Sequence, residues 1–67
     1  MVTVNGEEAY IEVDERQHGQ TEVNAVIDEG AYVIASFASP QDANDFADLI
    51  QKKGKSYKVD GYRLIDG

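Results

Sequence analysis

An α+β fold is predicted: an antiparallel sheet of about four to six strands with one helix, approximately residues 40–53, packed on one face. Three observations predict it. Apolar and polar residues alternate in the first half of the chain, a capped segment with helical spacing follows, and Asn-Gly and Asp-Gly pairs near the two ends favour tight hairpin turns. The expected order is β-β-β-β-α-β(-β), in a single compact domain over residues 1–67.

Asn5-Gly6 predicts the first hairpin, between residues 2–4 and 7–13, because both residues accept the positive φ of a type I′ turn. A two-residue turn pairs Val4 with Glu7, and one face then carries the core positions Val2, Val4, Ala9, Ile11 and Val13. The opposite face carries Thr3, Glu8, Tyr10 and Glu12. Tyr10 is therefore expected on an exposed, acidic face.

Residues 14–20 have no periodicity and are expected to form a connection. Residues 21–28 alternate again, which predicts a third strand with Val23, Ala25 and Ile27 facing inward and Glu22, Asn24 and Asp28 opposite. After a turn at residues 28–30, the near-continuous apolar run of residues 31–38 predicts a central strand covered on both sides.

The helix has start and stop signals at both ends. Ser39 suits the N-cap, Pro40 the first helical position and Asp42 the first turn, while Gly54 suits the C′ position. Helical spacing predicts one apolar stripe, formed by Ala43, Phe46, Ala47 and Ile50. One helix covers only one face of such a sheet, so the other face is expected to be partly exposed and to be a candidate interface.

Two interpretations of the C-terminal segment remain open. Asp60-Gly61 favours a two-residue hairpin turn, which places Tyr57, Val59, Tyr62 and Leu64 on one face. The alternative is a single strand with a bulge at Gly61.

The chain carries a net charge of −7, unevenly spread along its length. Residues 1–51 hold eleven acids and only Arg16, which gives −10, whereas residues 52–67 hold five bases and two acids, which gives +3. Such a charge repels nucleic acid and anionic membranes, so no direct nucleic-acid partner and no membrane partner are expected.

Catalytic residues, cofactors and metal sites are not expected. His18 is the only histidine and there is no cysteine, so familiar metal sites and nucleophile–base pairs lack their parts. The glycines are isolated and form no phosphate loop. Absence of cysteine favours a reducing compartment, and neither a spanning segment nor a basic leader is evident, so a cytoplasmic protein is expected.

The leading hypothesis is a small acidic protein, not an enzyme, that inhibits or modulates a larger protein by binding its basic surface, such as one that normally holds nucleic acid. Its physical profile resembles that of phage-type anti-defence inhibitors, which is a likeness of charge and size rather than homology. The alternative is a homo-oligomeric structural or scaffold module, for instance a homodimer, whose acidic surface is incidental. Residues expected to contact the partner are Glu8, Tyr10, Glu12, Asp14, Glu15, Asp28 and Glu29.

Overall fold

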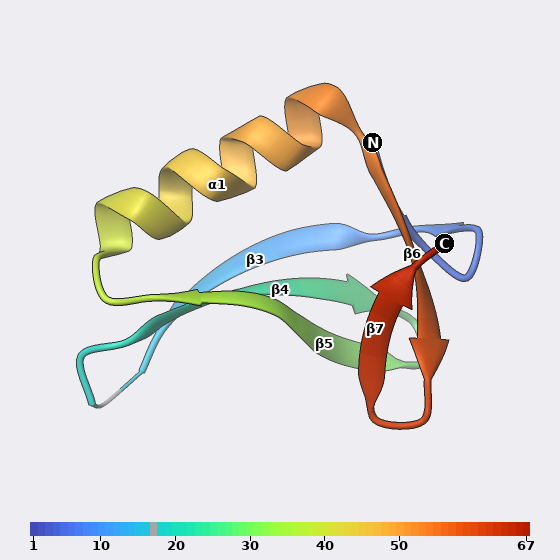
Figure 1. Cartoon of the computed structure of the whole chain (residues 1–67), viewed down its shortest axis with the longest axis horizontal. Coiled ribbons are helices and arrows are strands. Elements are labelled where there is room, and N and C mark those ends of the chain that lie inside the picture. Colours follow the sequence, from blue (N-terminus) through green and yellow to red (C-terminus); the bar gives the residue numbers. More distant parts are fainter. Residues whose placement is uncertain (17) are drawn as a thin grey trace.

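The computed structural model describes residues 1–16 and 18–67 and confirms the α+β class (Figure 1). The helix, α1, spans Pro40–Lys53, as predicted. The strands are β1 (Val2–Val4), β2 (Glu7–Glu8), β3 (Tyr10–Glu15), β4 (Thr21–Ile27), β5 (Gly30–Phe37), β6 (Lys55–Asp60) and β7 (Arg63–Asp66). In the part of the chain that is described, no helix is both long and apolar enough to cross a membrane.

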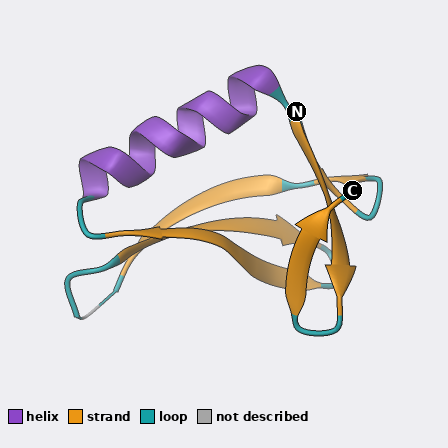
Figure 2. Ribbon diagram, viewed as in Figure 1, coloured by secondary structure: helices purple, strands orange, loops and turns teal. Residues whose placement is uncertain are grey.

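The strands form two sheets (Figure 2). The terminal sheet has the order β2-β1-β6-β7, and the meander sheet has the order β3-β4-β5. All pairings are antiparallel except that of β1 with β6, which is parallel and sets Val4 opposite Tyr57. The predicted first hairpin is present, with Val4 opposite Glu7 and Asn5 at a φ of 53°. The chain then passes at Ala9 from the terminal sheet to the meander sheet.

Capping hydrogen bonds pair a backbone N–H at the start of the helix and a backbone carbonyl at its end. The backbone N–H of Gln41 donates to Ser39 Oγ at 3.2 Å, and the N–H of Gly54 donates to the carbonyl of Ile50 at 2.8 Å. Gly54 has a φ of 84°, and a Cβ there would lie 3.2 Å from the carbonyl oxygen of Met1. The helix packs on one side of the meander sheet, against all three strands (Figure 1).

The core consists of two clusters on the inner side of the meander sheet. The first, beneath α1, contains Val2, Val23, Ala43, Ala47 and Ile50. The second contains Val4, Ala25 and Ile27, against which Tyr57, Val59 and Leu64 of the β6–β7 hairpin pack. The residues predicted to share the inner face of the first strands lie in these clusters or pack against them.

The prediction that residues 31–38 form a central strand covered on both sides is wrong. β5 is an edge strand, and the central strand is β4. The register shifts at Val23/Asn24, so Ala35 pairs with Val23 and Val33 with Asn24, which leaves Ile34 as an extra residue. Ile34 packs against the core, whereas Val33 is 51% exposed. The apolar run therefore reflects a bulge and an exposed apolar position.

The C-terminal segment is a hairpin, but its turn lies one residue later than predicted. Asp60 pairs with Arg63, so Gly61 and Tyr62 form the turn, with Gly61 at a φ of 65°. Tyr62 is fully exposed and does not share a face with Tyr57, contrary to the prediction. The observed register sets Val59 opposite Leu64, and both then pack against the second core cluster.

Candidate partner-binding face

The side of the meander sheet that faces away from α1 is exposed over much of its area. Strand alternation and register place nine residues on this side, here called the open face: Tyr10, Glu12, Asp14, Glu22, Asn24, Val26, Ala31, Val33 and Ser36. None of its apolar residues belongs to either core cluster or packs against one. The prediction that one sheet face stays partly exposed is therefore confirmed for the meander sheet.

Cross-strand pairing arranges the open face in three rows. Each row takes one residue from β3, β4 and β5 in turn: Tyr10–Val26–Ala31, then Glu12–Asn24–Val33, then Asp14–Glu22–Ser36. The row next to the β4–β5 turn is therefore apolar except for the hydroxyl group of Tyr10. The row next to the β3–β4 loop carries two acids, Asp14 and Glu22. Tyr10 is 70% exposed, so a large aromatic surface adjoins the carboxylates.

Arg16 lies at the acidic end of the open face and binds two of its carboxylates. Its Nε donates to Glu22 Oε1 at 2.8 Å and lies 3.4 Å from Asp14 Oδ2. The hydrogen bond to Glu22, followed by the charges of Asp14, Glu22 and Glu12, raises the pKa of Arg16. Three carboxylates thus act on a single guanidinium, and the open face keeps a negative excess.

Within residues 1–16 and 18–67, the other cations form no ion pairs with this face. Lys55 Nζ pairs with Asp66 Oδ1 at 2.9 Å on the terminal sheet. Among the residues that the structure describes, no ion pair joins the open face to the four cations that could have neutralised it, namely Lys52, Lys53, Lys58 and Arg63. Arg16 is therefore the cation that moderates the charge here.

Asn24 is a buried polar residue at the centre of the open face. It is 4% exposed, and its Oδ1 accepts no hydrogen bond in the described part of the chain. Its neighbours in the row are Glu12 and Val33. Because the great majority of buried polar groups in native proteins are paired, this oxygen is an exception that requires an explanation.

The residues predicted to contact a partner divide into three groups. Tyr10, Glu12 and Asp14 share the open face. Asp28 and Glu29 are exposed in the β4–β5 turn, next to the row of Tyr10, and the N–H of Asp28 donates to Glu7 Oε2 at 3.2 Å.

Glu8 and Glu15 lie away from the open face. Glu15 pairs with Thr21, which is buried on the helix side of the meander sheet. Glu8 pairs with Thr3 in the terminal sheet, because the chain changes sheets at Ala9.

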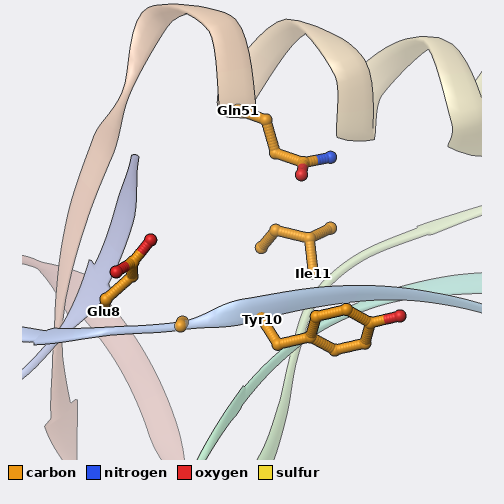
Figure 3. Close-up of a pocket in the computed structure, with 5 residues that line it drawn as sticks. Glu8, Tyr10, Ile11 and Gln51 are labelled. Atoms are coloured by element: carbon orange, nitrogen blue, oxygen red, sulfur yellow. The ribbon is translucent and has the colours of Figure 1, made fainter.

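An open depression of ≈ 370 Å³ lies at the edge of β3, next to the helix. It is lined by Glu8, Ala9, Tyr10, Ile11 and Gln51. In Figure 3, Ile11 and Glu8 lie on the side of β3 that faces Gln51, whereas the Tyr10 ring lies on the opposite side. The depression therefore borders the open face at Tyr10 without being part of it.

Several residues of the open face were not among the predicted contacts. Alternation in β4 did place Glu22 and Asn24 on the side away from the core. Ala31 and Val33 could not be assigned to a face, because they belong to a near-continuous apolar run.

Among the described residues, no group of three or more His, Cys, Asp or Glu side chains is arranged to hold a metal ion, and His18 is exposed. No protein-family model, curated protein or solved structure matches this chain.

Proposed function

We propose that this chain is a cytoplasmic binding protein, not an enzyme, that modulates a larger protein by docking its open face on a basic surface of that partner. One observation carries the proposal: the exposed Tyr10 and Val33 adjoin the carboxylates of Glu12, Asp14 and Glu22 on one sheet face that the core does not use. The specific form of the proposal is inhibition by occupying a surface that normally binds nucleic acid, as phage-type anti-defence inhibitors do.

The two kinds of group on the open face have different roles in such binding. Tyrosine and valine supply apolar area, and tyrosine is enriched among the residues that dominate interface energetics. The carboxylates and the net charge of −7 speed the encounter with a positive surface and set its orientation. An association of this kind weakens as salt concentration rises.

Affinity capture with two charge-matched variants tests this function. Glu12→Lys with Asp14→Lys reverses two charges on the open face, and Asp45→Lys with Asp48→Lys reverses two on the exposed side of α1. The native chain and the α1 variant should capture the same basic protein at low salt, and the open-face variant should lose it. Equal capture by both variants, or capture unaffected by salt, would overturn the proposal.

A homo-oligomeric module is the second candidate. The observation in its favour is that β3 and β5 are edge strands of the meander sheet, and unpaired strand edges can add a strand from another chain. Charge acts against pairing through β3, because Glu12 and Asp14 of one copy would lie close to those of the other.

A further inference from the structure

The unpaired oxygen of Asn24 indicates what kind of group the open face binds. A buried acceptor without a donor is unfavourable relative to a paired one, because nothing compensates for its loss of hydration. The side chains beside it in the row cannot supply the donor, because the carboxylate of Glu12 only accepts and Val33 has no polar atom. The missing donor is therefore to be sought in the partner that covers this face.

The side chains around Asn24 indicate which kind of donor group would fit there. Glu12 lies directly across from Asn24, and Tyr10 lies on the diagonal, so a carboxylate, an amide oxygen and an aromatic ring surround one position. A guanidinium suits all three, because it is a planar cation with five N–H donors that stacks on aromatic rings. A lysine ammonium is a compact point charge without a flat surface to stack.

Arg16 is a precedent within the chain for this kind of binding. In the adjacent row its guanidinium is held by Glu22 at 2.8 Å and lies near Asp14 at 3.4 Å. The row of Glu12 and Asn24 offers a similar combination of acceptors without a guanidinium.

We propose that an arginine side chain of the protein partner docks on the row Glu12–Asn24–Val33, donates to Asn24 Oδ1 and the carboxylate of Glu12, and stacks against the ring of Tyr10. This inference rests on the proposed function and adds the chemistry of the group recognised. Asn24 Oδ1 is buried in the free protein and the core clusters lie on the other side of the sheet, so docking requires side chains of the open face to move aside and expose this oxygen. Binding supplies a donor that Asn24 Oδ1 does not find in the described part of the free protein.

Titration with N-acetyl-arginine amide and N-acetyl-lysine amide at low ionic strength, followed by NMR, tests this inference. Both probes carry one positive charge, so their difference reports the guanidinium. The arginine probe should shift the side-chain amide signals of Asn24 and the ring signals of Tyr10 in a saturable way. The lysine probe should bind roughly tenfold more weakly, as expected for loss of a hydrogen bond that involves a charged group.

Three variants complete the test. Asn24→Leu keeps the shape of the side chain and Glu12→Gln keeps its length, and both should weaken arginine binding roughly tenfold. Asp48→Asn removes one charge from α1 and should change nothing. Loss of binding in Asn24→Leu is not a folding defect if its unfolding midpoint is at least that of the native chain.

Three outcomes would overturn the arginine proposal. They are equal binding of the two probes, undiminished arginine binding by Asn24→Leu, and shifts confined to residues outside the open face. The first two would leave the proposed function standing, as docking by charge alone. That function would fail separately, if capture of the basic protein survived Glu12→Lys with Asp14→Lys.

Discussion

Glu12 and Asn24 lie directly opposite each other on β3 and β4, and the buried oxygen of Asn24 receives no donor from its neighbour. As far as the described residues show, the free protein therefore bears an unmet desolvation cost in the middle of the open face. Under the proposed function, such a cost is the expected form of a trade between stability and function.

Replacing Asn24 by leucine should stabilise the free protein. The substitution keeps the shape of the side chain and removes a buried acceptor that has no partner, so the free energy of unfolding should rise by about 1–2 kcal/mol. Urea unfolding measures this change. Asn24→Asp is the matched opposite, because it buries a charge and should be destabilising. A destabilised Asn24→Leu variant would mean that the oxygen is paired in solution.

Asn5 joins the first hairpin to β6, and its removal should loosen the terminal sheet. Its Oδ1 accepts from the N–H of Val59 at 3.0 Å, and its φ of 53° lies in the left-handed region. Asn5→Ala loses the hydrogen bond and strains the backbone, which should cost about 1–2 kcal/mol in unfolding free energy. Asn5→Gly loses only the hydrogen bond and should cost less. Equal losses in the two variants would show that the backbone conformation is not strained by alanine.

Tyr57 should make the fold sensitive to alkaline pH. Burial, supported by the charge of Asp66 and opposed by that of Lys55, raises its pKa above the ordinary value of 10.0. The unfolded chain then ionises first, so the stability contributed by the neutral phenol is complete below pH 10.0 and declines above it. Chemical unfolding of the native chain and Tyr57→Phe at several alkaline pH values measures this effect. An identical decline in both proteins would exclude Tyr57 as its source.

The isolated chain should be monomeric at micromolar concentration. Pairing of two meander sheets through β3 would bring Glu12 and Asp14 of one copy near those of the other, and like charges across a strand pair are destabilising. Size-exclusion chromatography with light scattering gives the mass directly. A stable dimer at low salt would favour the homo-oligomeric module instead.

Local signals in the sequence predicted the parts of the fold that depend on neighbouring residues. The helix was predicted with its observed bounds, because Ser39, Pro40 and Gly54 act on the backbone next to them. The turn at Asn5-Gly6 was predicted for the same reason, and its register sets Val4 opposite Glu7 as expected.

Features that depend on distant contacts were not predictable in this way. The parallel pairing of β1 with β6 joins the two ends of the chain, and no local pattern encodes it. The C-terminal turn lies at Gly61 and Tyr62, which sets Val59 opposite Leu64 against the second core cluster and leaves Tyr62 exposed. The turn preference of Asp60-Gly61 does not encode this choice of register.

The open face was only partly predictable. Alternation located Tyr10 and Glu12 on it, because β3 keeps a regular period. Alternation could not place Val33 on this face, because the bulge at Ile34 changes which residues of β5 point away from the core. It also could not reveal that Asn24 is buried, because burial depends on the side chains around it. Glu8 was grouped with Tyr10 because the break between the sheets at Ala9 leaves no mark on the alternation.

Docking through the open face is tested most directly by the affinity of the chain for its captured basic partner, measured as a function of salt concentration. The native chain and the variant with Asp45→Lys and Asp48→Lys should bind alike and weaken steeply as salt rises, whereas the variant with Glu12→Lys and Asp14→Lys should bind weakly at every salt concentration. An affinity that is independent of salt, or that falls equally in both variants, would contradict binding by this face.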